Sequence, residues 1–182
     1  MQHLLTNLSN TISKGLIIDL IKDELEIKED GSPCKKVILK SKRKQIFAFS
    51  LDTNLANRCK MFPFFNQSTQ LINKVNDGIV FYLNDGKIFV LLIELKSNKL
   101  GDYKKQLQAG KNFVYLLLST LNNSFSSNYT VEEENIKCLV FSLRKTIKKQ
   151  GTKRANIIYE KIDGLNIKEL QCNDTHFLEK FL

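Results

Sequence analysis

Cysteine and histidine, the usual protein ligands of structural zinc, are scarce in this sequence of 182 residues. It has two histidines, one near each end, and four cysteines, none of which belongs to a Cys-x-x-Cys pair. The cysteines are Cys34, Cys59, Cys138 and Cys172. This usage is typical of neither a zinc site nor a disulfide framework. We therefore expect four reduced thiols in a cytoplasmic protein.

Long apolar runs are also absent. No run reaches the roughly 20 residues that a membrane-spanning helix needs, and the first ten residues lack the basic and apolar regions of a secretory signal. Hydrophobic residues make up 42% of the chain and charged residues 26%. These values are close to the globular average and indicate neither disorder nor a membrane protein. The length suits one domain with a core of its own.

Acidic residues are fewer than basic ones, 19 against 28, which gives a formal net charge of +9. A basic protein attracts polyanions, of which nucleic acid is the commonest in a cytoplasm. Much of the excess lies in two clusters. The first comprises Lys35, Lys36, Lys40, Lys42, Arg43 and Lys44, and the second Arg144, Lys145, Lys148, Lys149, Lys153 and Arg154. A role in solubility alone is the alternative for either cluster.

The spacing of apolar residues predicts a mixed series of helices and strands. The expected elements are a helix at 4–22, strands at 36–41 and 45–51 around a basic turn, a short helix from Asp52 or Thr53 to Cys59, a hairpin at 77–97, a helix at 102–121, a loop at 122–128, a strand at 136–143, and a strand pair at 155–160 and 165–171 around an Asp163-Gly164 turn. A right-handed crossover through the second long helix should place strand 136–143 parallel to strand 88–96. The prediction is a single α/β domain over residues 1–182 with a mixed β-sheet.

The strongest hairpin signal is the Asp-Gly pair at 85–86, because both residues tolerate the positive φ of a type I′ turn. With this pair as the loop, Asn84 pairs with Lys87, and Asp77 lies directly opposite Glu94. Their Cβ atoms would then be about 4.5–5.5 Å apart. A three-residue loop would instead turn the two carboxylates to opposite faces.

The end of this hairpin combines two acids and an amine. Lys96 follows Glu94 by two residues and shares its face, so Asp77, Glu94 and Lys96 are expected together. Opposed carboxylates repel each other unless a cation compensates, and such a pair suits Mg²⁺, with Mn²⁺ as a possible substitute. A lysine beside the cation can position or deprotonate a water. The alternative is a turn aspartate followed by two ordinary surface charges.

At these residues the sequence resembles the PD-(D/E)xK nuclease superfamily, whose signature is an acid at one strand start and Glu-x-Lys on the next strand. The resemblance implies an αβββαβ restriction-endonuclease-like core at about 4–143, flanked by helices, with a basic loop and extra strands at 144–182. It implies Asp77, Glu94 and the Leu95 carbonyl as metal ligands, with Lys96 assisting the attacking water. Many members carry a further acid on the first helix, for which Glu24 is the best-placed candidate and Asp19 the next.

Helix 102–121 carries a polar stripe beside its apolar face, and we expect part of it to contact phosphates. The candidate nucleic-acid-binding residues are Lys42, Arg43, Lys44, Lys104, Gln108, Lys111, Arg144, Lys145, Lys148 and Lys149. A solvated helix face is the alternative reading of the stripe. Some exonuclease branches carry Gln-x-x-x-Tyr on this helix. Here the residue four positions after Gln106 is Gly110 and not a tyrosine, which argues against those branches.

Together these features predict a Mg²⁺-dependent nuclease that hydrolyses phosphodiester bonds in DNA, in preference to RNA. An endonuclease of restriction, repair or defence type is favoured, and a homodimer is compatible with it. The first alternative is a non-catalytic nucleic-acid-binding or assembly protein that retains the nuclease fold. The second is a structural domain whose charges serve its surface.

Overall fold

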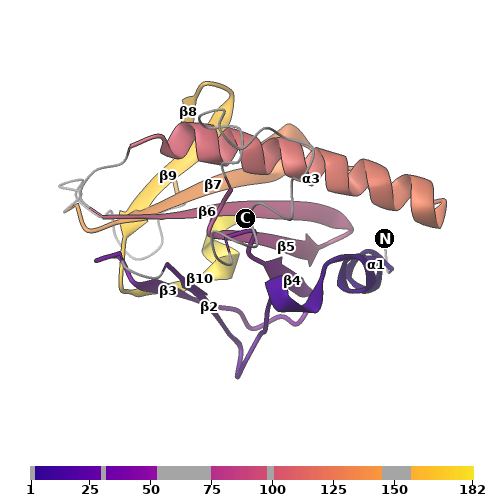
Figure 1. The fold of residues 1–182 in the computed structure, drawn as a ribbon, viewed down its shortest axis with the longest axis horizontal. Coiled ribbons are helices and arrows are strands. Elements are labelled where there is room, and N and C mark those ends of the chain that lie inside the picture. The colour runs from indigo at the N-terminus through magenta and orange to yellow at the C-terminus, as the bar shows by residue number, and fades with distance from the viewer. Residues whose placement is uncertain (1–2, 30–31, 53–74, 98–100, 145–156) are drawn as a thin grey trace.

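The computed structural model describes residues 3–29, 32–52, 75–97, 101–144 and 157–182 (Figure 1). Its elements, in chain order, are α1 (Leu4–Thr11), the 3₁₀ turn η1 (Lys14–Leu16), β1 (Ile17–Ile18), β2 (Glu24–Lys28), β3 (Lys36–Lys40), β4 (Ile46–Phe49), β5 (Gly78–Asn84), β6 (Lys87–Lys96), α3 (Tyr103–Phe125), η2 (Glu133–Asn135), β7 (Ile136–Ser142), β8 (Glu160–Ile162), β9 (Leu165–Gln171), β10 (Thr175–Phe177) and η3 (Leu178–Phe181).

Most strands belong to one mixed sheet of seven strands in the order β1-β4-β5-β6-β7-β9-β8. From β1 to β6 each strand is antiparallel to the next. Strands β6, β7 and β9 run parallel to one another, and the edge strand β8 is antiparallel to β9. Helix α3 connects β6 to β7, which is the crossover that a parallel pair requires. The expected parallel arrangement of strand 136–143 is therefore confirmed. A second sheet of three strands has the order β10-β3-β2.

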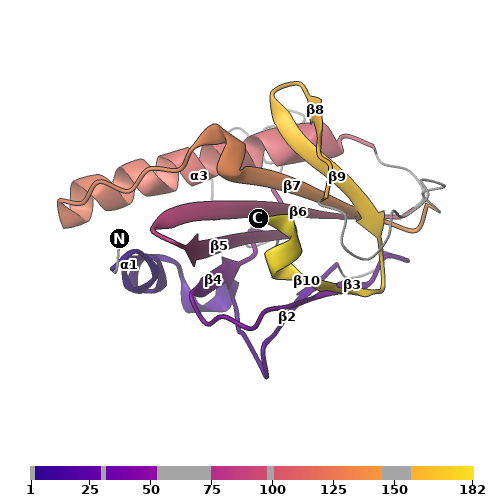
Figure 2. The ribbon, with the colours of Figure 1, turned by 180° about the vertical axis from the view of Figure 1, so that it is seen from behind.

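Two apolar layers form, one on each face of the large sheet. On one face, side chains of α1 and α3 pack against β4 to β7. On the other face, β2, β3 and the C-terminal turn η3 pack against the same strands. Figures 1 and 2 show the long helix α3 and the small sheet on opposite sides of the large one. The described parts of the chain thus form one α/β domain with mixed sheets and two α-helices.

The hairpin has the register that the sequence predicts. Asn84 pairs with Lys87, and the ladder continues to Gly78 opposite Ile93. Asp85 and Gly86 adopt the positive φ angles of 48° and 74° that the turn requires. The next position along this register sets Asp77 against Glu94.

The expected helix at 4–22 is wrong beyond Thr11. Ile12 is already extended, with φ −79° and ψ 130°, and closes the first helix as its C-cap. Ile17 and Ile18 then pair with β4 as a short edge strand. Both residues are β-branched and suit a strand, so the helical spacing of the leucines did not decide their conformation. Residues 24–28, which follow this edge strand, form β2 of the small sheet, a strand that was not predicted from the sequence.

Other boundaries differ less. Helix α3 extends to Phe125, and Ser126 caps it in the left-handed conformation. Residues 122–125 of the expected loop at 122–128 are therefore helical. The apolar face expected for this helix is buried. The last strand pair surrounds the Asp163-Gly164 turn as predicted, although its first strand is Glu160–Ile162. The short helix expected at 52–59 lies almost wholly outside the described residues.

The expectation of four reduced thiols is wrong for two of them. Cys34 and Cys172 form a disulfide with a Cα–Cα distance of 5.7 Å, across a sequence separation of 138 residues. No local spacing can signal such a pair, because the fold brings together a residue two positions before β3 and the residue directly after β9. Cys138 is free and buried, and Cys59 lies outside the described residues.

In the described portion of the chain, none of the helices combines the length and the apolar character needed to cross a membrane.

Candidate metal centre

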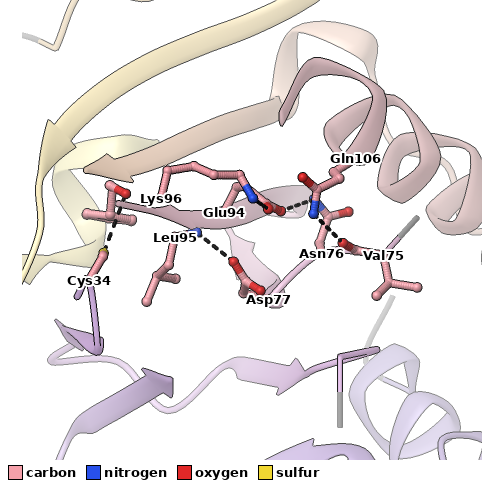
Figure 3. A network of polar contacts seen from close by, with 9 residues as sticks. Cys34, Val75, Asn76, Asp77, Glu94, Leu95, Lys96 and Gln106 are labelled. Atoms are coloured by element: carbon pink, nitrogen blue, oxygen red, sulfur yellow. Dashed lines mark hydrogen bonds and ion pairs between the residues drawn. The ribbon is translucent and has the colours of Figure 1, made fainter. Parts of the chain in front are cut away.

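The candidate centre lies where β5 begins and β6 ends (Figure 3). Asp77 immediately precedes β5, and Glu94, Leu95 and Lys96 are the last residues of β6. The first turns of α3 lie beside them in the same view. Burial on both faces of the large sheet encloses this strand end, so the charged groups here are held inside the protein.

Asp77 is 3% exposed and is held by a main-chain donor. Its Oδ2 atom accepts a hydrogen bond of 2.6 Å from the amide of Leu95. The bond crosses from the segment before β5 to the end of β6, and it fixes the carboxylate against the strand that carries Glu94. Leu95, the residue expected to offer a carbonyl ligand, therefore also orients the first carboxylate through its N–H.

Glu94 is fully buried and has two side-chain partners. One oxygen accepts a short hydrogen bond from Lys96 Nζ, and the other accepts one of 3.5 Å from Asn76 Nδ2. The Lys96 side chain is only 15% exposed. The lysine is thus held by the carboxylate two residues before it, on the shared face that strand alternation requires.

Both carboxyl groups are harder to ionise than free ones. Burial is the main cause that raises the pKa of Asp77 well above its ordinary value, and the charge of Glu94 adds to it, against the Leu95 amide. Burial likewise raises the pKa of Glu94 to about 7, although Lys96 opposes the shift. Two acids that repel each other in a buried place favour a compensating cation. Each ionised carboxylate thus makes the other harder to ionise.

Residues of the surrounding shell hold this pair in place. Gln106 on α3 donates a hydrogen bond of 3.3 Å to the carbonyl of Val75, which anchors the segment before β5. Asn76 is completely buried, and its Oδ1 atom has no hydrogen-bond partner among the described residues. Gly110 leaves the space that this side chain fills, since an added Cβ would meet Asn76 Oδ1 at 1.7 Å. From the sequence, Gly110 is expected on the apolar face of this helix, and Gln106 is noted only for the Gln-x-x-x-Tyr motif that Gly110 breaks.

Glu29 is a site residue that sequence reasoning missed. It directly follows β2. Burial is the largest cause of the raised pKa values of Asp77 and Glu94, and the charge of Glu29 is a smaller cause that raises both. Its Oε2 atom is buried without a hydrogen-bond partner in the described structure. The alternation of apolar and charged residues in ELEIK, 24–28, was the signal for the strand that positions it.

The expected additional acid, Glu24, does not join the centre. It lies at the start of β2, not on a helix, and forms an ion pair of 2.8 Å with Lys40. A strand rises about 3.3 Å per residue, so Glu24 is roughly 16 Å along the strand from Glu29. Asp19, the weaker candidate, is exposed between β1 and β2. The helix on which both were placed ends at Thr11.

The candidate phosphate-binding residues differ in their exposure and in their side-chain partners. Lys42 and Lys44 are exposed, and Arg43 contacts Asn84 at the hairpin turn. Lys104 pairs with Asp163 at 3.2 Å, and Gln108 donates to Asn112 at 3.1 Å. Arg144 is exposed, whereas Lys145, Lys148 and Lys149 lie outside the described residues.

Lys111 is not part of a free polar stripe. It is 7% exposed, forms an ion pair with Glu133 and donates a hydrogen bond of 3.3 Å to the carbonyl of Gly164. These contacts join α3 to the segment before β7 and to the β8–β9 turn. Its geometry assigns it a structural role in place of the expected phosphate contact.

Across the described ranges, no three or more His, Cys, Asp or Glu side chains are gathered closely enough to hold a metal ion. The centre consists of the Asp77 and Glu94 carboxylates with Lys96, and with Glu29 near them. The chain matches no family model, and no curated protein or solved structure gives a significant match.

Proposed function

We propose that the protein is a Mg²⁺-dependent nuclease that hydrolyses phosphodiester bonds in DNA. The observation that carries the proposal is the pair of buried carboxylates, Asp77 and Glu94, beside the amine of Lys96 at one strand end. A fold does not normally retain two adjacent buried acids unless they serve a site. The net charge of +9 provides the long-range attraction for a polyanionic substrate.

The proposal extends to the fold. The elements α1, β4, β5, β6, α3 and β7 follow the order helix, three strands, helix, strand. The strands among them are neighbours in the order β4-β5-β6-β7, with the last pair parallel. We take these six elements as the αβββαβ core, with β1, β2 and β3 inserted between α1 and β4, and β8 to β10 added after it.

The residues present fit a hard divalent cation. Carboxylate and carbonyl oxygens are the ligands that Mg²⁺ prefers. A further carboxylate oxygen, Glu29 Oε2, is buried without a hydrogen-bond partner among the described residues, and the charge of Glu29 acts on Asp77. Asp77, Glu94 and the Leu95 carbonyl would hold the cation. When bound, it would polarise the phosphodiester and make a bound water more acidic.

The protein groups around that cation have separate tasks. Glu94 holds the Lys96 ammonium at the site, where it can orient the attacking water or stabilise charge on the phosphoryl oxygens. Asn76 binds the other oxygen of Glu94 and so restricts rotation of the carboxylate. Gln106 fixes the Val75 carbonyl and thereby the segment that presents Asp77.

The test is incubation with supercoiled plasmid DNA in Mg²⁺ or Mn²⁺, with EDTA as the metal-free control. We expect nicking that EDTA stops and that Lys96→Ala abolishes. The matched control is Lys36→Ala, an exposed lysine of β3 that pairs with Glu26, which should cut like the wild type. Nicking that persists in Lys96→Ala would contradict the assignment. Salt-sensitive retention of DNA without any cutting would favour the non-catalytic nucleic-acid-binding protein.

A further inference from the structure

The position of Glu29 is fixed from both sides of the turn that follows β2. Before it, Ile27 packs so tightly on the start of β5 that a Cβ at Gly78 would meet its Cδ1 atom at 2.8 Å. At the residue itself, the backbone amide donates a hydrogen bond of 3.1 Å to the carbonyl of Lys35. Beyond it, Cys34 is bonded to Cys172. The carboxylate is thus kept at the same end of the hairpin as Asp77.

The carboxylate of Glu29 differs from those of Glu24 and Glu26, the two glutamates of β2. Glu24 pairs with Lys40, and Glu26 pairs with both Lys28 and Lys36. These are ordinary cross-strand and same-face ion pairs of a solvated sheet. Glu29 Oε2, in contrast, is buried and accepts no hydrogen bond in the described part of the chain. A buried acceptor without a donor lowers the stability of the fold.

The neighbours of Glu29 make its placement more unfavourable still. Its charge interacts with Asp77 and with Glu94, and both interactions are repulsive between ionised groups. The charges of three acids, which lie at the ends of β2, β5 and β6, therefore act on one another, and Lys96 is already bound to one of them. A bound divalent cation would offset all three repulsions at once.

We propose that Glu29 is a third carboxylate of the cation site and acts on the cation through its coordinated water. This rests on the proposed function, because it presupposes a cation at Asp77 and Glu94. Direct coordination by three acids is not what the described geometry offers, and Mg²⁺ usually keeps several of its waters in protein sites. Glu29 is thus a positioning residue that takes the place expected for Glu24.

The experiment is a titration of the metal-free protein with Mn²⁺ alone, followed by electron paramagnetic resonance of the free ion. We expect Glu29→Gln to weaken Mn²⁺ binding roughly 10-fold, since partners in the outer shell of a metal typically contribute 10–100-fold to its affinity. The matched control is Glu24→Gln on the same strand, which should bind like the wild type. Asp77→Asn serves as the reference for loss of a direct ligand and should bind more weakly than either.

A thermal melt without metal separates this role from a purely structural one. Glu29→Gln removes a repulsive charge, so its melting temperature should equal or exceed that of the wild type. A lower melting temperature would show that Glu29 serves the fold and would overturn the inference. So would wild-type Mn²⁺ affinity in Glu29→Gln, with the cation site itself left standing. Failure of the wild type to bind Mn²⁺ would overturn the site and Glu29 together.

Discussion

Gly110 of α3 and Asn76 are in such close contact that a Cβ at position 110 would lie 1.7 Å from Asn76 Oδ1. Asn76 in turn donates to Glu94, so helix α3 contacts the candidate centre through one amide side chain. The glycine is required by this approach rather than by its backbone angles.

Replacing this glycine should therefore damage both the fold and the site. We expect Gly110→Ala to lower the free energy of unfolding by about 1–3 kcal/mol, as overpacking of a filled core does. Displacement of Asn76 should also weaken Mn²⁺ binding. Urea denaturation measures the first effect. Gly15→Ala is the matched control, because nothing lies within 4 Å of a Cβ there, and equal stabilities of the two variants would contradict the packing argument.

The raised pKa values predict how stability depends on pH in the absence of metal. Burial raises the pKa of Glu94 to about 7 from an ordinary 4.5, and that of Asp77 also lies above its usual range. Between pH 4.5 and 7, Glu94 keeps its proton in the folded protein but has released it in the unfolded chain. The contribution of Glu94 to stability should therefore fall by roughly 3 kcal/mol as pH rises from about 4.5 to 7 and then level off, and the raised pKa of Asp77 acts in the same direction. Urea denaturation at pH 5, 6, 7 and 8 measures this slope.

Two variants check that the slope comes from Glu94. Glu94→Gln cannot titrate and should reduce the dependence to the part that comes from Asp77, whereas Glu26→Gln should keep it in full. Hydrogen bonds and charges of Lys28 and Lys36 lower the pKa of Glu26, so it stays ionised throughout this range. Mn²⁺ affinity should rise over the same interval, since the cation competes with the protons. A stability that rises from pH 5 to 7 in the wild type would refute the assignment.

The hairpin was predictable because its information is local. An Asp-Gly turn fixes the loop, the loop fixes the register, and the register decides which residues lie opposite each other. The crossover helix was predictable for a similar reason, since its apolar face repeats at a regular spacing. Asp77, Glu94 and Lys96 followed from these two elements without any knowledge of the rest of the fold.

The residues that sequence reasoning missed depend on distant contacts. Leucines at helical spacing suggested a helix through residue 22, but Ile17 and Ile18 pair with β4 instead. That error hid β2, and with it the position of Glu29 at the end of this strand. The bond between Cys34 and Cys172 was invisible in the same way, because only the packing of the small sheet brings them together.

The basic residues of α3 should separate into structural and phosphate-facing ones. Lys111 is buried and tied to Glu133 and Gly164, so Lys111→Met should lower stability by about 1 kcal/mol or more. Lys104 makes an exposed pair with Asp163, and such pairs contribute about 0–1 kcal/mol. Lys104→Met should instead weaken DNA binding and reduce its salt dependence. Chemical denaturation and fluorescence anisotropy with labelled DNA distinguish the two, and the reverse pattern would contradict this division.

The disulfide predicts a measurable effect of reductant. Reduction with dithiothreitol should expose two additional thiols per chain and lower stability by about 2–4 kcal/mol, as loss of a native disulfide commonly does. Thiol titration of the denatured protein and urea denaturation measure these changes. The double variant Cys34→Ser/Cys172→Ser should have the lower stability from the outset and no response to reductant. The same number of thiols before and after reduction would show that the bond does not form.

The same bond should also influence the metal centre through Glu29. Cys34 closes the turn that begins at Glu29, so its release from Cys172 frees the carboxylate to move away from Asp77. Reduction should then weaken Mn²⁺ binding in the wild type, and it should have less effect in Glu29→Gln, where the outer carboxylate is already gone. The comparison is a double-mutant cycle in which dithiothreitol replaces one mutation. Equal losses in both proteins would mean that the disulfide supports the whole small sheet rather than this carboxylate.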